Sequence, residues 1–324
     1  MKNYVITGAS GHIGNNLVRL INKIEPDAKI VALTRREIGK ELEGTVCSQE
    51  IGNLADEKFL AKHIKKDSIV IHLACLIDLT NKKRAESFEI NFGITKKICD
   101  ICLKNKVKKF VYVGSVDAIA NTNDKETISE PEDYFPELVE GNYGISKAMA
   151  MKYVLNCMKE NPSFNCAIAI PTAVIGVNDL KPSPAGKILV DTLKNKTQMG
   201  MKGGYNFVDV EDVATAIHTL ANNDLRDQYI LSGTSVTVKE LYMFVNNSKG
   251  LKKRPIIFPT WLVKLCVPFV KVLNKITVKA LLAPHNYSSQ KAKQDFNYTT
   301  KPINETLKNT VDWLEKYYIK NNEK

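Results

Sequence analysis

The chain opens with the apolar run Asn3–Thr7, which leads directly into the glycine-rich stretch Gly8–Gly14. Apolar residues then recur at helical spacing until Pro26. A strand that passes through such a turn into a helix brings free backbone N–H groups close to a phosphate, because no Cβ obstructs the approach. This beginning predicts a fold that binds a dinucleotide. Glycines at an ordinary tight turn are the alternative interpretation.

Short apolar runs continue along the chain, each separated from the next by a segment long enough for a helix. The further predicted strands are Lys29–Leu33, Ser68–Leu73, Lys109–Val113, Asn165–Ile170 and Gln228–Leu231. This order predicts an α/β protein with a doubly wound parallel sheet of the Rossmann type. After about Pro171 we expect longer loops and helices. We predict a dinucleotide-binding domain formed by residues 1–177 and about 202–233, and a smaller C-terminal substrate lobe formed by about 178–201 and 234–324.

The charge of the chain and its cysteines indicate which partners and which cellular compartment to expect. The formal net charge is +11, but the lysines are scattered between acidic residues, so we expect a solvated surface and no nucleic-acid partner. The first strand begins too close to Met1 for a secretory signal, which predicts a cytoplasmic protein with reduced thiols. Cys99 and Cys102 form a CxxC pair inside an apolar helical pattern. We expect core packing for this pair and no metal site.

The segment Pro255–Leu273 is the most apolar part of the second half of the chain. Pro259 and Pro268 interrupt it, and Lys264 and Lys271 would lie on one side of a helix. These features predict no integral membrane segment. We expect a lobe helix that lines the substrate pocket, with peripheral contact to a membrane as the alternative.

The end of the second predicted strand indicates which nicotinamide cofactor is bound. An acidic residue at this position would hold the ribose hydroxyls of NAD. The chain has Thr34, Arg35 and Arg36 there instead. Guanidinium groups suit a 2′-phosphate, so we predict that NADP(H) is preferred and that NAD(H) is possible. Arginines that serve only as surface charge are the alternative.

The candidate catalytic residues follow the fourth predicted strand. Ser115 stands just after this strand, and Tyr143 and Lys147 are four residues apart in the stretch YGISK. Residues four apart share one face of a helix, so the ammonium of Lys147 can approach the phenol of Tyr143 and favour its ionised form. A tyrosine with a lowered pKa can exchange a proton with a carbonyl or alcohol oxygen that Ser115 holds by a hydrogen bond.

The stretches TGASGHIG, HLA, INF, YGISK and FVDVEDVA, together with Ser115, resemble the extended short-chain dehydrogenases/reductases, also called the NAD-dependent epimerase/dehydratase superfamily. The resemblance covers nearly the whole chain. The stretch IPTAVIGVND and the C-terminal part that begins SSQKAKQDFNY are most similar to bacterial proteins like dihydroflavonol 4-reductase. The resemblance implies that Ser115, Tyr143 and Lys147 are catalytic, that the Gly8–Gly14 turn binds pyrophosphate, and that the region after Ile170 helps to shape the substrate pocket.

The predicted cofactor-binding residues come from the glycine turn, the ends of the predicted strands and the helix that carries the tyrosine. They are Thr7, Gly8, Ser10, Gly11, His12, Ile13, Gly14, Thr34, Arg35, Arg36, Asn53, Leu54, Leu73, Ala74, Asn91, Tyr143, Lys147 and Pro171. The sequence departs from the family at three positions. Gly114 replaces a serine that often precedes the catalytic one, Asn53 stands where an aspartate usually meets the adenine, and Ile170 replaces a frequent arginine. Adenine contacts and substrate preference therefore stay open.

Several other polar residues have a structural and a functional interpretation. Asn91 could contact the cofactor or bond locally, and both remain open. His72 is expected to pack at the end of its strand, and Asp209 and Asp212 are explained equally well by a helix start that favours acidic residues and by a carboxylate pair. The predicted substrate-pocket residues are Val116, Thr172, Val174 and Phe207.

Together these features predict an NADP(H)-dependent carbonyl reductase or alcohol dehydrogenase, monomeric or homodimeric, for a small and fairly apolar ketone, aldehyde or hydroxysteroid-like substrate. In reduction Tyr143 would be the general acid, Ser115 would hold the oxygen, and Lys147 would bind ribose and tune the phenol. One alternative is an NAD-dependent nucleotide-sugar epimerase or dehydratase, which copurified NAD+ would favour. A non-catalytic NAD(P)-binding sensor is the other, and the presence of both Tyr143 and Lys147 argues against it.

Overall fold

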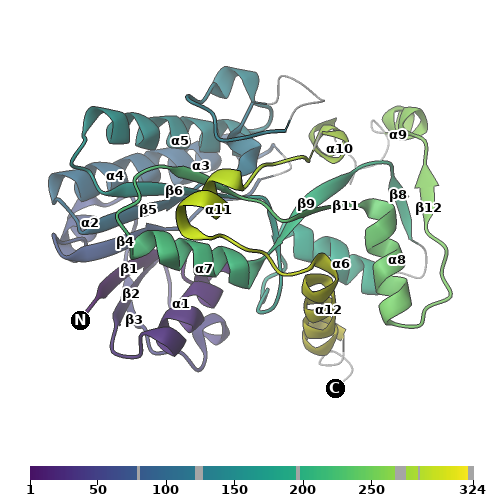
Figure 1. Cartoon of the computed structure of the whole chain (residues 1–324), viewed down its shortest axis with the longest axis horizontal. Coiled ribbons are helices and arrows are strands. Elements are labelled where there is room, and N and C mark those ends of the chain that lie inside the picture. Colours follow the sequence, from purple (N-terminus) through teal and green to yellow (C-terminus); the bar gives the residue numbers. More distant parts are fainter. Residues whose placement is uncertain (79–80, 121–126, 195–197, 267–274, 284, 320–324) are drawn as a thin grey trace.

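A computed structural model describes residues 1–78, 81–120, 127–194, 198–266, 275–283 and 285–319. Its centre is a seven-stranded sheet in the order β10-β6-β5-β4-β1-β2-β3, in which all neighbouring strands are parallel (Figure 1). The strands are β1 (Asn3–Thr7), β2 (Lys29–Thr34), β3 (Ser48–Ile51), β4 (Ser68–His72), β5 (Lys109–Val113), β6 (Cys166–Pro171) and β10 (Gln228–Leu231). The predicted doubly wound parallel sheet is confirmed.

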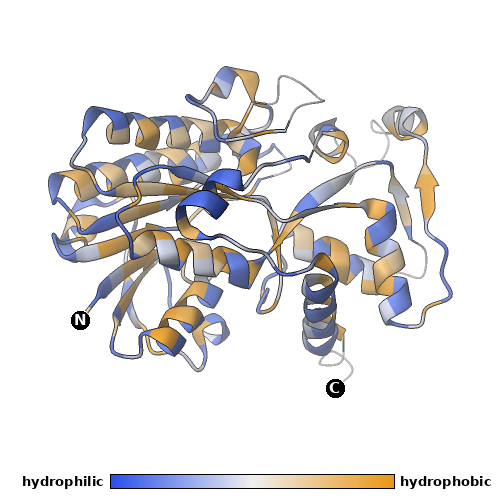
Figure 2. Ribbon diagram, in the orientation of Figure 1, coloured by the Kyte–Doolittle hydropathy of each residue, from blue (hydrophilic) through white to orange (hydrophobic). Residues whose placement is uncertain are grey.

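Alternating side chains send the apolar residues of each strand to two faces, where helices cover them. On one face, Tyr4 and Ile6 of β1 belong to a core with α1 (His12–Ile24), α7 (Val210–Ala221) and α11 (Gln290–Phe296). On the other face, Val5 belongs to a core with α2 (Glu57–His63), α4 (Ile94–Lys104) and α5 (Asn142–Glu160). Hydrophobic residues are concentrated on the strands and on the sides of the helices that face them (Figure 2).

Short helical turns join these elements near the carboxyl edge of the sheet. They are a 3₁₀ turn at Lys40–Leu42, α3 (Arg84–Phe88), a π-helical turn at Glu89–Gly93, a 3₁₀ turn at Val116–Ala118 and a 3₁₀ turn at Pro136–Leu138. Cys99 and Cys102 of α4 are fully buried in the core, which confirms that this pair packs inside the protein.

The remaining elements form a lobe beside the sheet (Figure 1). They are a three-stranded sheet of β7 (Ala173–Ile175), β9 (Gly204–Asp209) and β11 (Thr234–Thr237), a strand pair of β8 (Met199–Met201) and β12 (Ile256–Phe258), the helices α6 (Pro184–Lys194), α8 (Val238–Ser248), α9 (Thr260–Cys266), α10 (Lys275–Leu282) and α12 (Ile303–Leu314), and a π-helical turn at Glu315–Ile319. Leu189 of α6, Leu241 of α8 and Val311 of α12 share one core with the three-stranded sheet. Helices from the two predicted pieces of the substrate lobe therefore pack together.

The secondary structure differs from the expectation in two places. Strand β3 gave no apolar signal because it lies at the sheet edge, where none of its residues is buried. Five short strands also stand where longer loops and helices were expected after Pro171, because three to six residues carry little periodicity and pair with distant partners. Strands β7 and β9, from the predicted dinucleotide-binding part, pair in the lobe sheet with β11, whereas α11 packs on the main sheet.

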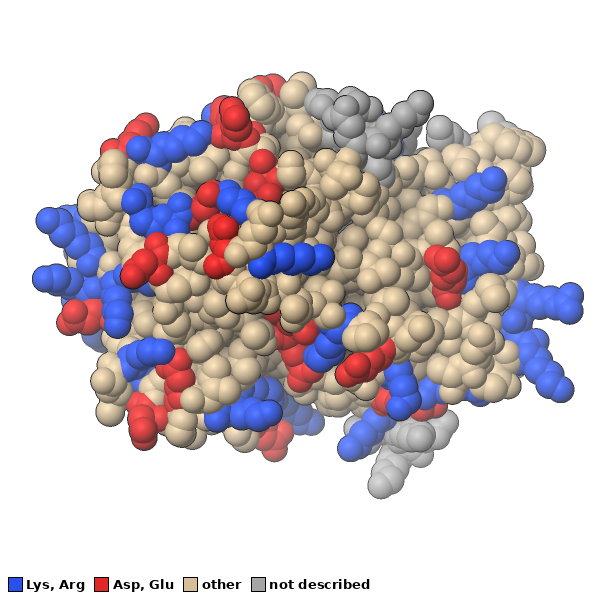
Figure 3. All heavy atoms as spheres, in the orientation of Figure 1, with Lys and Arg blue, Asp and Glu red and all other residues tan. Residues whose placement is uncertain are grey.

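The distribution of surface charge and the apolar segment after residue 254 were used to predict whether the protein binds nucleic acid or a membrane. On the face in Figure 3, lysines and arginines are interspersed with aspartates and glutamates. No helix among the described residues is both long enough and apolar enough to cross a membrane. Of the apolar segment Pro255–Leu273, residues 267–273 lie outside the described part of the chain.

Candidate active site

The glycine turn between β1 and α1 brings backbone segments closer together than a side chain would allow. Gly8 has a φ of +75°, and a Cβ there would lie 2.6 Å from the backbone N of Ala74, which follows β4. A Cβ on Gly14 would overlap the carbonyl oxygen of Gly8. Gly11 precedes α1 without a side-chain cap, and the first turn of α1 carries no acidic residue. The turn therefore offers bare N–H groups to an anion, and these residues fit a bound pyrophosphate.

The side chains just after this turn point toward the lobe. His12 Nε2 bonds to the carbonyl oxygen of Val177 at 3.0 Å, and Asn16 donates to the same oxygen at 3.1 Å. The Nδ1 of His12 lies 4.0 Å from a carboxylate oxygen of Asp179. The ring of His12 therefore connects the glycine turn to the segment at Val177, and the backbone N–H of His12 is left to contact a cofactor.

The end of β2 presents two exposed arginines. Thr34 is buried, and its hydroxyl donates to the carbonyl oxygen of Arg36 at 2.7 Å, which shapes the turn after the strand. Arg35 and Arg36 are exposed beyond it. Asn53 follows β3, the strand that neighbours β2 in the sheet. Its side-chain oxygen accepts a hydrogen bond from the backbone N of Ala55 at 2.9 Å. The side-chain amide nitrogen of Asn53 is therefore the group that can donate a hydrogen bond to a ligand.

His72 at the end of β4 is a buried, neutral packing residue. The backbone N of Ala74 donates to the Thr7 hydroxyl, which in turn lies 2.6 Å from His72 Nδ1. The Thr95 hydroxyl donates to the Asn91 carbonyl and lies 2.8 Å from His72 Nε2. These partners assign the ring proton to Nε2. Burial, assisted by the charge of Lys147, lowers the pKa of His72 to about 3, as expected for a residue that packs at the strand end.

Asn91 uses its side chain to tie two segments of the site together. Its oxygen accepts a bond from the backbone N of Leu76 at 2.7 Å, and its amide donates to the Leu76 carbonyl at 2.9 Å. The same amide donates to the Ser146 hydroxyl at 3.0 Å. Asn91 therefore holds the loop after β4 against α5. Of the two interpretations left open by the sequence, these bonds support the local one.

Ser115 and Tyr143 meet at the carboxyl edge of the sheet. Ser115 follows β5 and caps the turn Val116–Ala118, while Tyr143 lies in the first turn of α5. The Ser115 hydroxyl donates to a carboxylate oxygen of Asp117 at 3.2 Å, and it lies near enough to the Tyr143 phenol to act on the pKa of Tyr143. Burial raises the pKa of Tyr143 well above its ordinary value, and the charges of Cys75 and Asp117 act in the same direction. The phenol is therefore protonated at neutral pH.

Lys147 lies on the same side of α5 but reaches a different tyrosine. Its ammonium donates to the carbonyl oxygen of Val113 at 2.9 Å and to the hydroxyl of Tyr112 at 3.3 Å. Burial opposes the charge, yet Tyr112 and Cys75 outweigh it, and the pKa of Lys147 is raised. The expectation that Lys147 favours ionisation of Tyr143 differs from this arrangement, because the phenol bonded to the ammonium is that of Tyr112 on β5 and the pKa of Tyr143 is raised.

Gly144 makes the meeting of Ser115 and Tyr143 possible. A Cβ at this position would lie 2.8 Å from the backbone oxygen of Asp117 and 2.7 Å from a methyl group of Val139. Only a glycine lets α5 approach the turn after β5 this closely.

We expect Gly144→Ala to lower the free energy of unfolding by about 1–3 kcal/mol, because the turn must move away from α5. Alanine normally stabilises a helix relative to glycine, so a loss here would be diagnostic of the contact. Chemical denaturation measures it. Asn156→Ala, at an exposed position of the same helix, is the control and should be neutral or slightly stabilising. Unchanged stability in Gly144→Ala would contradict the interpretation.

The predicted pocket residues are dispersed. Val116 packs in the core beneath α5, Thr172 is buried with its backbone N donating to Leu231, and Val174 packs against the opposite core. Phe207 is only 2% exposed and lies in the core of the lobe. Tyr205, two residues earlier on β9, lies on the same face of the strand and packs partly against the same core, with its ring 5.9 Å from that of Phe207.

Two residues near Tyr143, Cys75 and Asp117, were not singled out from the sequence. Both are exposed, and both are among the causes that raise the pKa of Tyr143. Asp117 also raises the pKa of Tyr205 and of Tyr287, after burial. The position of Asp117, two residues after Ser115, is the one signal that could have indicated it.

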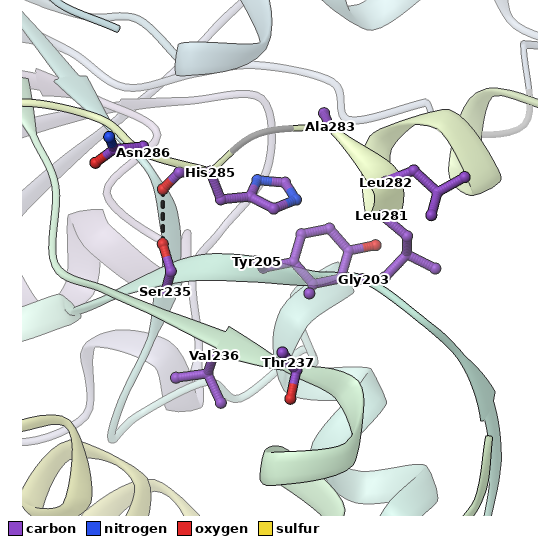
Figure 4. Close-up of a pocket in the computed structure, with 11 residues that line it drawn as sticks. Gly203, Tyr205, Ser235, Val236, Thr237, Leu281, Leu282, Ala283, His285 and Asn286 are labelled. Carbon is purple, nitrogen blue, oxygen red and sulfur yellow. Dashed lines mark hydrogen bonds between the residues drawn. The ribbon is translucent and has the colours of Figure 1, made fainter. Parts of the chain in front are cut away.

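A pocket of about 540 Å³ opens beside Tyr205, between β9, β11 and the end of α10 (Figure 4). The ring of Tyr205 lies 5.7 Å from that of His285, and Ser235 donates to the His285 carbonyl at 2.7 Å. Burial lowers the pKa of His285, so its ring is neutral. Among the described residues that line the pocket, none is a lysine, arginine, aspartate or glutamate.

Comparison with known proteins identifies the family. A model of the NAD dependent epimerase/dehydratase family matches residues 4–231. The chain is 25% identical to a putative dihydroflavonol 4-reductase of Synechocystis, over 98% of this chain and 96% of that protein. It is 22% identical to sterol demethylase protein B of Methylococcus capsulatus, over 79% of this chain and 77% of that protein.

Solved structures share the fold. The crystal structure of gox2253 is similar with a TM-score of 0.85 at 22% identity, covering 98% of this chain and 99% of that one. A UDP-glucose 4-epimerase of Thermotoga maritima, solved with UDP-glucose, is similar with a TM-score of 0.78 at 20% identity, covering 97% and 99%. Because the family match spans the whole main sheet, from β1 to β10, the chain belongs to the NAD-dependent epimerase/dehydratase family.

Proposed function

We propose that the protein is an NADP(H)-dependent carbonyl reductase or alcohol dehydrogenase for a small substrate without negative charge. The observation that carries the proposal is the proximity of Ser115 and Tyr143 at the same edge of the sheet as the glycine turn. A protonated phenol beside a second hydroxyl is suited to hold a carbonyl oxygen and deliver a proton to it.

The cofactor assignment rests on two groups of residues. The Gly8–Gly14 turn would hold the pyrophosphate, and the exposed Arg35 and Arg36 would hold a 2′-phosphate beyond β2. Bound nicotinamide supplies or accepts the hydride. The ammonium of Lys147 has three N–H groups and donates two of them to Val113 and Tyr112. The third can donate to a ribose hydroxyl.

In the direction of reduction, Tyr143 donates its proton to the oxygen of the substrate, and Ser115 holds that oxygen by a hydrogen bond. Lys147 keeps its positive charge in the buried site and holds the Tyr112 hydroxyl and the Val113 carbonyl oxygen at the end of β5. Burial and the charge of Asp117 raise the pKa of Tyr143, so the phenol holds its proton at neutral pH.

The substrate class follows from the charges around the site. The described lining of the pocket beside Tyr205 is uncharged, and Asp117 adds a negative charge close to Tyr143. An anion that enters loses its hydration without gaining a cation, which costs free energy. We therefore place neutral ketones and aldehydes before sugar nucleotides as substrates.

We expect neutral ketones or aldehydes to be reduced with kcat/KM values at least about tenfold above that for UDP-glucose, since the difference reflects an uncompensated anion. Oxidation of NADPH, followed for both substrate classes with the same enzyme, measures the ratio. Product analysis for UDP-glucose is the companion assay, because epimerisation consumes no cofactor. Preferential turnover of UDP-glucose would refute the substrate class.

A nucleotide-sugar epimerase is the second candidate, and the similarity in fold to the Thermotoga maritima epimerase is the observation that favours it. Such an enzyme would carry NAD+ through purification. Release of stoichiometric NAD+ on denaturation would therefore support the epimerase and count against the reductase. A protein that binds NADPH but turns over no carbonyl compound or sugar nucleotide would be a sensor.

A further inference from the structure

The short strand pair of β8 and β12 lies at the outer end of the lobe, and α8 covers one of its faces (Figure 1). A Cβ on Gly200 of β8 would lie 2.7 Å from a methyl group of Val238, the first residue of α8. The Tyr242 hydroxyl of the same helix donates to the Met199 carbonyl at 2.9 Å. This face is therefore closed by packing.

The opposite face of the strand pair is covered only in part. Met201 and Phe258, which lie side by side in the register, pack with Val263 of α9 in a small core. Met199 and Ile256 also lie side by side, two residues earlier on each strand, so they share this face. They are 56% and 48% exposed. The apolar face therefore continues beyond the core and reaches the surface.

Trp261 extends this apolar surface on the outer side of α9. It stands two residues before the buried Val263, and residues two apart point to nearly opposite sides of a helix. Since Val263 packs onto the strand pair, Trp261 points away from it and is 65% exposed. Met199, Ile256 and Trp261 therefore face outward on the same side of the lobe, and we call these three residues the apolar tip.

Positive charge adjoins the apolar tip. Residues 241–266, which run from α8 through β12 to α9, contain no aspartate or glutamate, and their basic residues are Lys249, Lys252, Lys253, Arg254 and Lys264. Lys249 forms ion pairs with carboxylates of α12 and of the turn after it. Lys252 and Arg254, shortly before β12, are exposed, and a hydrogen bond from Asn246 to the Lys253 carbonyl at 3.1 Å holds their segment against α8. Lysines and arginines project from this end of the lobe in Figure 3.

We propose that the apolar tip docks on the surface of an anionic lipid bilayer as a peripheral contact, which is the alternative interpretation of the segment Pro255–Leu273. An exposed tryptophan is favoured at a membrane interface, and neighbouring basic side chains are attracted to anionic headgroups. Met199 and Ile256 would leave water in the same step, which adds favourable free energy. A second copy of this chain is the less suitable occupant, because two basic tips would repel each other.

Cosedimentation with lipid vesicles tests the proposal. We expect the protein to bind vesicles of phosphatidylcholine that contain about one-third phosphatidylglycerol, and to bind pure phosphatidylcholine at least about tenfold more weakly. Lys252→Gln combined with Arg254→Gln should weaken binding to the anionic vesicles by roughly thirtyfold, since each basic side chain near the surface contributes about fivefold. Trp261→Ala should weaken it by roughly tenfold, because less apolar surface leaves water.

Lys66→Gln combined with Lys108→Gln is the matched control. These exposed lysines stand just before β4 and β5, at the amino edge of the main sheet, so their loss removes the same charge away from the apolar tip. Binding should stay within about twofold. Circular dichroism and thermal unfolding check that each variant is folded. Equal weakening by the two double variants would mean that net charge alone drives adhesion, and the proposal would be overturned.

Tryptophan fluorescence locates the contact, because the chain has two tryptophans and the second, Trp313 of α12, packs against the core of the lobe. Vesicles that contain brominated phosphatidylcholine should quench the emission of Trp261. Trp261→Phe keeps an aromatic ring at the apolar tip, so this variant should still bind while its emission stays unquenched.

Three results would overturn the proposal: no binding to anionic vesicles, binding without quenching in the unmodified protein, or a dimer in light scattering that Trp261→Ala dissociates. The last would assign the apolar tip to contact between copies of the chain. These measurements use neither substrate nor cofactor, so their outcome is independent of the proposed function.

Discussion

Tyr143→Phe should reduce turnover of a carbonyl substrate by about a hundredfold or more while NADPH affinity stays nearly unchanged. The substitution removes one oxygen from a buried side chain and leaves its ring in place, so the lost group is the proton donor. Stopped-flow oxidation of NADPH gives the rate, and fluorescence titration gives the affinity. Near-normal turnover in this variant would refute the assignment of Tyr143 as the proton donor.

Tyr153→Phe is the matched control for this substitution. Tyr153 lies on the same helix, but its hydroxyl bonds to Asp100 and Lys96 on the outer side of the protein. Loss of that hydroxyl should leave turnover within about twofold, because the exposed bond is worth little and is remote from the site.

The pH dependence of reduction follows from the same residue. A general acid must be protonated, and burial together with the nearby charges raises the pKa of Tyr143. The rate of reduction should therefore be flat through neutral pH and fall only as the pH rises through this raised pKa. In Tyr143→Phe that alkaline decline should disappear from the residual rate.

Arg35→Ala should weaken NADPH binding by about ten- to a hundredfold and leave NADH binding nearly unchanged. Charge-assisted hydrogen bonds to a phosphate are worth about 1.5–3 kcal/mol, and only NADPH carries the 2′-phosphate that would accept them. Calorimetric titration of both cofactors measures the two affinities. Equal weakening of both would mean that Arg35 does not contact this phosphate, and a preference of the unmodified protein for NADH would refute the cofactor assignment.

Lys66→Ala controls for the loss of one positive charge. Lys66 is exposed just before β4 begins, at the amino edge of the sheet, whereas Arg35 follows the carboxyl end of β2. Its removal changes the net charge by the same amount without touching the proposed phosphate site. Both affinities should stay within about twofold at moderate ionic strength.

Much of the fold could be predicted because its signals are local. The helix after the glycine turn was expected to end at Pro26, and α1 ends at Ile24. The predicted strands of the main sheet agree with the observed ones to within one residue at each end, because buried parallel strands form continuous apolar runs. Edge strand β3 was missed because it is exposed and gave no such run.

The site could be predicted only in part. Spacing placed Tyr143 and Lys147 on one side of a helix, yet the contact that Lys147 makes depends on Tyr112, a residue of another strand. Phe207 looked suitable for the pocket by its type, but the strand it occupies turns it into the core of the lobe. Asp117 carried no pattern of its own, and its contact with the Ser115 hydroxyl became evident only in the folded turn after β5.

By itself the sequence determined the parallel α/β sheet, the bare glycine turn and the choice of Ser115, Tyr143 and Lys147 as candidate catalytic residues. Periodicity, glycine sterics and spacing along one helix are properties of neighbouring residues, so they can be followed along the chain. Only the tertiary structure decided that Lys147 bonds to Tyr112 of another strand, and that the lobe forms a pocket with an uncharged described lining beside Tyr205. Those outcomes depend on which distant segments pack together, and packing is settled by the burial of whole faces rather than by any local pattern.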